Sequence, residues 1–277
     1  MKLNVEQFRK WDRKAITLLG MSGVGKTRLA CLLRDAHWFH YSGDYRIGTH
    51  YLSEAMSDNV KQKAMQVPLL KKLLLSDSIT ISNNISVDNL KAVSTFLGQL
   101  GDPEKGGLGL REFKRRQNLH REAEISAMLD VPDFIQRSHD VYDYKHFIND
   151  AGGSLCELED ESVLKTLAEH TLIIYIRATE QDEVELIKRA EQAPKPLYYR
   201  EAFLDEHLDV YLKENNLEYA AMIDPDDFVR WIFSKLFYNR IPRYQAIADK
   251  YGYTVCTNNI ARVNSETDFL ELIEQQL

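Results

Sequence analysis

The sequence predicts a three-layer α/β fold in which a parallel sheet of about five strands lies between helices. Short apolar runs typical of buried strands, the clearest at 171–176, alternate with segments whose apolar residues recur at helical spacing. The chain has 277 residues, 44% of them hydrophobic, which suffices for a large core. We therefore expect residues 1–277 to form a single domain.

Five segments are expected to be strands, and each lies beside a helical pattern or a turn signal. The first strand precedes a helix over 27–34, and a helix over 244–251 precedes the fifth. Ser265, with Asp268 three residues on, predicts the cap of a last helix. The expected strands are 15–19, 37–41, 145–149, 171–176 and 253–257.

Residues 51–144, between the second and third strands, have helical periodicity and few strand signals. This stretch is too long for a simple crossover. Gly and Pro residues divide it into several helices, the last expected over 110–129. We interpret 51–144 as a helical insertion that forms a lid or a substrate-binding subdomain.

The segment from Gly20 to Thr27 matches the phosphate-binding loop pattern G-x-x-x-x-G-K-[ST]. Glycines let such a loop curl with its N–H groups turned inward, and the following helix directs its positive end at the bound anion. Lys26 can then reach the outer phosphates of ATP, and the Thr27 hydroxyl can ligate Mg²⁺. The expected nucleotide-binding residues are Gly20, Met21, Ser22, Gly23, Val24, Gly25, Lys26, Thr27 and Arg28.

Two acidic residues follow expected strands and are candidates for catalysis. Asp150 begins the pattern Asp150-x-x-Gly153, which in phosphate-loop proteins places a carboxylate near the metal and a glycine N–H near the terminal phosphate. Asp44 could order the water shell of the metal or act as general base toward a substrate hydroxyl. Each could also be an ordinary turn residue. The sequence leaves open which of the two lies closer to the metal.

Cationic side chains form a third group of candidates. Arg46 could bind an anionic substrate group or form an exposed ion pair. The locally basic run 111–121 could face a cleft or water. Thr179 and Asp182 predict a capping box that opens a helix bearing Arg189. Arg189, in a mobile segment with 194–196 and Arg200, could offset charge in the transition state, or it could merely pair with Glu185.

Together the loop, Asp44, the Asp150-x-x-Gly153 pattern and the strand before the arginine-bearing helix resemble the P-loop kinases of nucleosides, nucleotides and other small metabolites. The resemblance implies a P-loop fold, ATP with Mg²⁺ as cofactor, a helical substrate-binding part and an arginine-bearing lid. It also implies that 257–261 lies near the nucleotide base. The loop is specific for the superfamily, whereas no signature of a particular acceptor is present.

We therefore predict transfer of the terminal phosphoryl group of ATP to a small-molecule acceptor, with Lys26, Asp44, Asp150 and Arg189 as catalytic residues and Thr27 and Asp150 as metal ligands. The alternative is an ATPase or nucleotide-dependent switch that acts on a protein partner. No N-K-x-D motif follows the fourth expected strand, which disfavours a regulatory GTPase.

Composition excludes several other classes. A net charge of −7 disfavours broad nucleic-acid binding, and no apolar run is long enough to span a membrane. The histidines lack zinc-site spacing.

Cys31, Cys156 and Cys256 lie far apart and are expected to be small core residues in a reducing compartment. The first 14 residues lack the apolar stretch of a signal peptide, so we expect a cytosolic protein. Trp231, Phe233, Phe237 and Tyr238 are expected in the core.

Overall fold

A computed structural model describes residues 2–277 and shows a five-stranded, all-parallel sheet in the order β2-β3-β1-β4-β5. The strands are β1 (Ala15–Leu19), β2 (Trp38–Ser42), β3 (His146–Asp150), β4 (Leu172–Arg177) and β5 (Gly252–Cys256). All five strand predictions are confirmed to within one residue at each end. The predicted α/β fold class is likewise confirmed.

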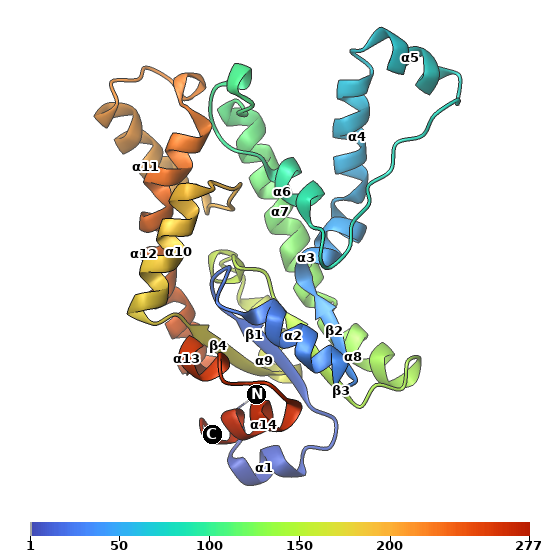
Figure 1. The fold of residues 1–277 in the computed structure, drawn as a ribbon, viewed down its shortest axis with the longest axis vertical. Helices are drawn as coiled ribbons and strands as arrows, with labels where there is room; N and C mark the ends of the chain where they lie inside the picture. Colours follow the sequence, from blue (N-terminus) through green and yellow to red (C-terminus); the bar gives the residue numbers. More distant parts are fainter. Residues whose placement is uncertain (1) are drawn as a thin grey trace.

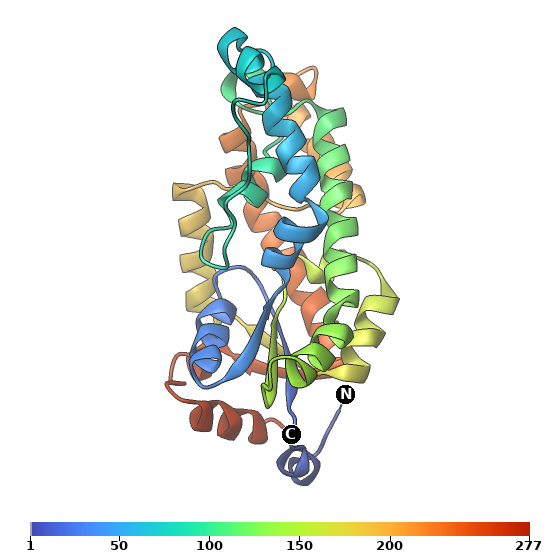
Figure 2. The same ribbon diagram turned by 90° about the vertical axis from the view of Figure 1, so that its right-hand side faces the viewer.

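Helices cover both faces of the sheet. Helix α2 packs on one face, and α8, α9 and the second half of α12 pack on the other (Figure 2). The longer helices are α2 (Lys26–Asp35), α4 (Ser53–Ala64), α5 (Pro68–Leu75), α7 (Leu110–Leu129), α8 (Val131–Asp140), α9 (Glu161–His170), α10 (Glu180–Gln192), α11 (Glu201–Glu214), α12 (Pro225–Tyr251) and α14 (Glu266–Glu274). The shorter ones are α1 (Val5–Lys10), α3 (Gly43–Arg46), η1 (Ile47–Tyr51), α6 (Lys91–Leu97), η2 (Pro103–Lys105), η3 (Leu155–Glu157), η4 (Ala220–Met222) and α13 (Thr257–Ile260).

The central strands are buried on both faces, which explains their apolar sequences. Every residue of β1 is buried, and so are the first five of the six residues of β4. Parallel strands covered by helices on both sides lose the alternation of apolar and polar residues that a half-exposed strand shows. The main hydrophobic core surrounds these strands and includes Trp38, Phe147 and Phe269.

Two groups of helices extend beyond the carboxyl edge of the sheet (Figure 1). One, α4–α7, comes from the connection between β2 and β3; the other, α10–α12, comes from the connection between β4 and β5. A second hydrophobic cluster joins them, because Leu100 and Phe113 from the first connection pack with Phe203, Phe228 and Ile232 from the second. The boundary of a subdomain at 51–144 stays a prediction.

Local signals located several helix ends correctly. Helix α7 has the predicted bounds, and Thr179 and Asp182 form the predicted capping box. The Ser265 side chain accepts a hydrogen bond from the Asp268 N–H. The helix expected over 244–251 is the last part of the 27-residue α12. The observed helix extends further toward the N-terminus than predicted and contains Pro242, a residue type that usually ends or kinks a helix.

The prediction that the three cysteines lie in the core, together with four aromatic residues of α12, is only partly correct. Cys156 is buried, but Cys31 is half-buried and Cys256 is exposed, because it ends the edge strand β5. Phe237 is buried, whereas Tyr238 is 53% exposed. Adjacent residues on a helix point about 100° apart, so one face cannot bury both fully. Among residues 2–277, no helix combines the length and apolarity needed to cross a membrane.

Candidate functional site

The phosphate loop connects β1 to α2 at the carboxyl end of the central strand (Figure 1). Gly20, Gly23 and Gly25 have φ angles of 142°, 92° and 99°, values that residues with a Cβ rarely adopt. At Gly20 space is also required, because a Cβ there would lie 2.6 Å from the Ile176 carbonyl oxygen. The glycines thus permit the curled backbone that the motif predicts.

Lys26 is buried inside this loop. Its Nζ donates hydrogen bonds to the carbonyl oxygens of Gly20, at 2.7 Å, and Met21, at 3.0 Å. Burial lowers the pKa of Lys26, and the negative charges of Asp150 and Asp44 oppose that change. The ammonium group therefore lies within the curve of the loop, near two acidic side chains.

Thr27 and Asp150 meet directly, although 123 residues separate them. The Thr27 hydroxyl donates to Asp150 Oδ2 at 2.7 Å, because β3 lies next to β1 in the sheet and both strands end at this edge. Asp150 is buried, and His40 Nε2 lies 3.9 Å from the same carboxylate oxygen. A hydroxyl and a carboxylate are hard oxygen donors of the kind that Mg²⁺ prefers, so these two residues fit the expected metal. Asp150, rather than Asp44, contacts Thr27, the predicted metal ligand of the loop.

Asp44 lies at the end of β2, in the first turn of the short helix α3, whose N-cap is Ser42. The π-helical turn η1 follows directly. Asp44 is half-buried; burial and the neighbouring Asp150 charge raise its pKa to about 6. A carboxylate with such a pKa is ionised at neutral pH and is a stronger base than an ordinary aspartate.

Glu124 was not among the site residues predicted from the sequence. In the structure it lies next to Asp44. A Cβ built at Gly152 would lie 2.6 Å from Glu124 Oε1 and 3.2 Å from Asp44 Oδ1, so both carboxyl groups flank the same glycine. Glu124 is fully buried; its Oε2 accepts a hydrogen bond from the Ser154 hydroxyl at 2.6 Å, whereas its Oε1 has no hydrogen-bond partner among the described residues. Burial is the main cause that raises its pKa to about 7.

A sequence signal for Glu124 did exist. On α7 the buried positions include Phe113, Gln117, His120, Glu124 and Ala127, spaced three or four residues apart. Three of these five are polar or ionisable. Polar residues on the face that helical spacing assigns to the core indicate a site, but the basic run 111–121 is the more conspicuous feature of this helix in the sequence.

The turn after β3 also contacts the phosphate loop. A Cβ at Gly153 would lie 3.1 Å from the Ser22 nitrogen, and Arg240 of α12 donates to the Gly153 carbonyl oxygen at 2.9 Å. The Asp150-x-x-Gly153 segment therefore passes beside both Thr27 and Ser22. This is the placement expected of a turn that faces bound phosphate.

A pocket of about 490 Å³ opens on the other side of the loop. Leu186 of α10 covers the loop at Gly23, where a Cβ would lie 2.6 Å from its Cδ2. Arg28 donates to the carbonyl oxygens of Ile260 and Val263, which fixes the segment expected near the base. The pocket is lined by the phosphate loop, α10 and α13, including Gly25, Arg28, Arg189, Thr257 and Asn258.

Arg189 lines this pocket and pairs with Glu185 at 2.9 Å; its side chain is 65% exposed. The other arginine candidates are engaged elsewhere. Arg46 pairs with Asp130 at 2.8 Å, and Arg200 pairs with Glu157 and Glu159. Of the basic run, Arg116 is buried and donates to the Phe96 carbonyl oxygen, while Lys114 pairs with Glu201 and Asp205. The run is therefore mostly ion-paired and does not form a free cationic surface.

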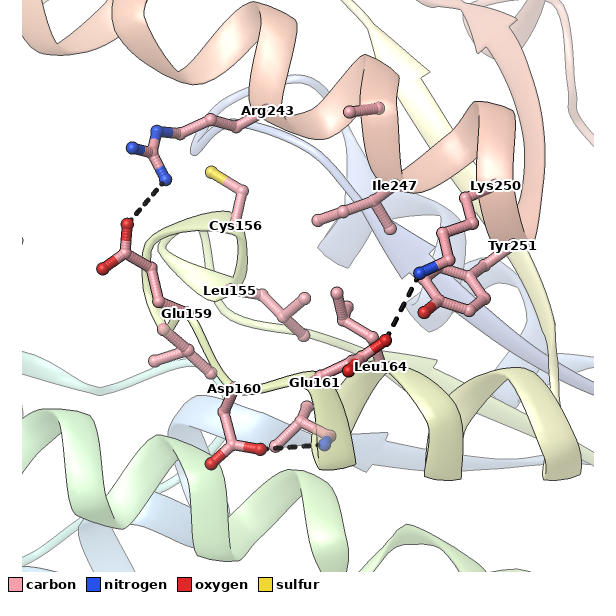
Figure 3. A pocket seen from close by; sticks show the side chains of 13 residues that line it. Leu155, Cys156, Glu159, Asp160, Glu161, Leu164, Arg243, Ile247, Lys250 and Tyr251 are labelled. Atoms are coloured by element: carbon pink, nitrogen blue, oxygen red, sulfur yellow. Dashed lines mark hydrogen bonds and ion pairs between the residues drawn. The ribbon is translucent and has the colours of Figure 1, made fainter.

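A separate pocket of about 410 Å³ lies between η3, α9 and α12, and none of the phosphate-loop residues lines it. Its floor is apolar, and the ion pairs Arg243–Glu159 and Lys250–Glu161 lie at its sides (Figure 3). This pocket is therefore separate from the predicted phosphate-binding site at the edge of the sheet.

Comparisons with known proteins give distant structural likenesses. Among solved structures, a shikimate kinase from Bacteroides thetaiotaomicron is 12% identical with a TM-score of 0.38, and the match covers 95% of each chain. A shikimate kinase from Acinetobacter baumannii in complex with shikimate is 14% identical with a TM-score of 0.32, and the match covers 86% of this chain and 99% of that one. No known protein family matches the sequence, and no curated protein is significantly similar to it.

Structural similarities with TM-scores this low support no inference about the function of this protein. The class of the protein follows from the all-parallel sheet and from the glycine loop between β1 and α2. These features agree with the three-layer P-loop α/β fold that the sequence predicted.

Proposed function

We propose that this protein is a kinase that transfers the terminal phosphoryl group of ATP to a small-molecule acceptor. One observation carries the proposal: the phosphate loop, the Thr27–Asp150 pair and the basic carboxylate Asp44 converge at adjacent strand ends of one sheet. Phosphoryl transfer needs these elements in one place, because its catalysis consists mostly of positioning and charge stabilisation. The cytosolic location expected from the sequence stays a prediction.

The roles follow from the geometry. The amides from Gly20 to Gly25 and the Lys26 ammonium would bind the phosphates, and Lys26 would exchange its two carbonyl partners for phosphate oxygens. Thr27 and Asp150 would hold Mg²⁺, whose charge offsets that of the phosphates when it is bound. The pocket beside Arg28 and Asn258 would receive the base.

In the proposed step, the acceptor hydroxyl oxygen forms a bond to the terminal phosphorus while the bond from that phosphorus to the bridging oxygen of ADP breaks. The hydroxyl proton passes to the Asp44 carboxylate. Arg189 could offset charge on the transferring group only after it leaves Glu185, an exposed contact worth about 0.3–0.5 kcal/mol. That contact is too weak to hold Arg189 away from the phosphates.

The test is acceptor-dependent transfer. The protein is incubated with ATP, Mg²⁺ and pools of metabolites, and phosphorus NMR follows ADP and new phosphoesters. We expect one pool to yield a new phosphoester. The Lys26→Ala variant should lose nucleotide binding and turnover, while Lys10→Ala, at an exposed position of α1, should behave like the wild type. Unchanged turnover in Lys26→Ala would remove the phosphate loop from the mechanism.

The second candidate is an ATPase or nucleotide-dependent switch that acts on a protein partner. Its support is the link from the Gly153 turn through Arg240 to the Tyr198 carbonyl oxygen, beside the second hydrophobic cluster. A switch would form ADP and inorganic phosphate equally with and without every metabolite pool, and a protein partner would accelerate it.

A further inference from the structure

Arg240 occupies an unusual position for an arginine. It lies in the middle of α12 with 5% of its surface exposed, at the level where that helix passes from one hydrophobic cluster to the other. Ile232 and Leu236 belong to the second cluster, and Phe237 and Tyr244 belong to the main core. A buried guanidinium is costly unless its donors have partners, so its contacts define its role.

Each end of the guanidinium has a different partner. Nη1 donates to the Gly153 carbonyl oxygen at 2.9 Å, and Nη2 donates to the Tyr198 carbonyl oxygen at 2.7 Å. Nε faces Glu157 Oε1 at 3.5 Å. One side chain therefore holds the turn beside the phosphate loop, the segment that leads into α11, and an acid from η3.

Glu157 completes the network. It is fully buried, and it lies 3.5 Å from Arg200 Nε as well as from Arg240 Nε. Glu159, which adopts a positive φ of 52°, pairs with Arg200 and with Arg243, the latter pair being visible in Figure 3. Arg121 of α7 also donates to the Leu158 carbonyl oxygen, at 2.6 and 3.0 Å. The segment from Gly153 to Glu159 is thus held by four arginines.

The segment before α11 is anchored a second time. Gln117 of α7 accepts from the Tyr199 N–H at 2.8 Å and donates to the Leu197 carbonyl oxygen at 3.2 Å. The Tyr198 ring stacks on His120 with centroids 5.6 Å apart. Because this segment is fixed on α7, Arg240 has a rigid support from which to hold the Gly153 peptide.

We propose that Arg240 is a positioning residue that fixes the Gly153 peptide against the phosphate loop, so that this turn recognises the terminal phosphate of ATP. The proposal rests on the proposed function, which brings a triphosphate to the loop beside Gly153. Arg240 contacts Gly153 only at its carbonyl oxygen. It acts through Gly153 and does not itself touch the nucleotide.

The inference predicts a loss of discrimination between ATP and ADP. Calorimetry with Mg²⁺ gives the dissociation constants of ADP and of a non-hydrolysable ATP analogue for the wild type, Arg240→Lys and Arg243→Lys. Lysine keeps the charge but cannot donate to two separated carbonyl groups in a fixed fork. Arg243, one turn further along α12, contacts Glu159 and Asn239, and serves as the matched control.

For Arg240→Lys we expect the dissociation constant of ADP divided by that of the ATP analogue to fall about tenfold. A tenfold change is at the low end of what the loss of one charge-assisted hydrogen bond causes. The ADP dissociation constant should stay within about twofold, because ADP lacks the phosphate that Gly153 faces. Arg243→Lys should leave the ratio unchanged. A purely structural role would weaken both ligands together.

Equal weakening of both ligands, or an unchanged ratio, would overturn the inference. Should Arg240→Lys fail to fold, Glu157→Gln provides the second measurement; it leaves Arg240 in place but removes the charge that faces its Nε, and a fall of the same ratio is expected. Failure of the proposed function looks different. A wild type that discriminates ATP from ADP but phosphorylates no acceptor would refute the kinase and leave the role of Arg240 intact.

Discussion

The buried carboxyl group of Glu124 makes the stability of this protein depend on pH in a calculable way. In the folded protein its pKa is about 7, against an ordinary value of 4.5. Because the folded-state pKa is raised, the contribution of Glu124 to the free energy of unfolding is fully present below pH 4.5. This contribution is lost as the pH rises through 7. A rise of that size corresponds to about 3 kcal/mol, at about 1.36 kcal/mol per pKa unit.

The Glu124→Gln variant removes this loss. The glutamine amide oxygen can still accept the hydrogen bond from Ser154, and no charge has to be buried at any pH. Relative to the wild type, Glu124→Gln should gain about 2–3 kcal/mol more at pH 8 than at pH 5 in its free energy of unfolding. Urea titrations of the nucleotide-free protein in EDTA measure this difference.

The control is Glu122→Gln, on the exposed side of the same helix, which should show the same small change at both pH values. If Glu124→Gln differs from the wild type by the same amount at pH 5 and pH 8, Glu124 is not ionised at a cost inside the folded protein. The carboxyl pair around Gly152 would then lack the electrostatic character described above.

Two further predictions follow from individual contacts. Asp44→Asn should lower phosphoryl transfer by about 100-fold or more while ATP affinity is retained. In the wild type, transfer should decrease when the pH is lowered below 6, because Asp44 then takes up a proton. Normal transfer in Asp44→Asn would exclude Asp44 as the base. Gly252→Ala should destabilise the fold by about 3 kcal/mol, because a Cβ at this first residue of β5 would lie 2.2 Å from the Ile173 carbonyl oxygen. Gly109→Ala, where a Cβ meets nothing within 4 Å, is its control, and equal thermal melting of the two variants would contradict the packing described here.

Sequence reasoning succeeded where a feature depends on neighbours along the chain. The phosphate loop, helix α7 and the capping box at Thr179 are all set by residues within a few positions of one another. The short apolar strands were also recognisable, because burial on both faces leaves a continuous apolar run. These features account for the fold class and for one side of the candidate site.

The rest of the site depends on contacts between distant segments. The meeting of Thr27 with Asp150 depends on the strand order, which no local pattern contains. Asp44 and Glu124 both lie beside Gly152 because α7 packs against α3 and η1, which follow β2 in the chain. In the sequence, Arg240 is one of many charged residues and no local pattern marks it. In the structure it is buried and donates to the carbonyl oxygen of Gly153, 87 residues away.

The sequence alone therefore determined that this protein contains a phosphate loop on a parallel α/β sheet, since backbone conformation and strand burial are encoded by adjacent residues. Only the tertiary structure decided which acids and which arginine surround that loop. Their identities depend on the packing of α7 and α12 against the sheet edge, and packing between distant segments leaves no short-range pattern in the chain.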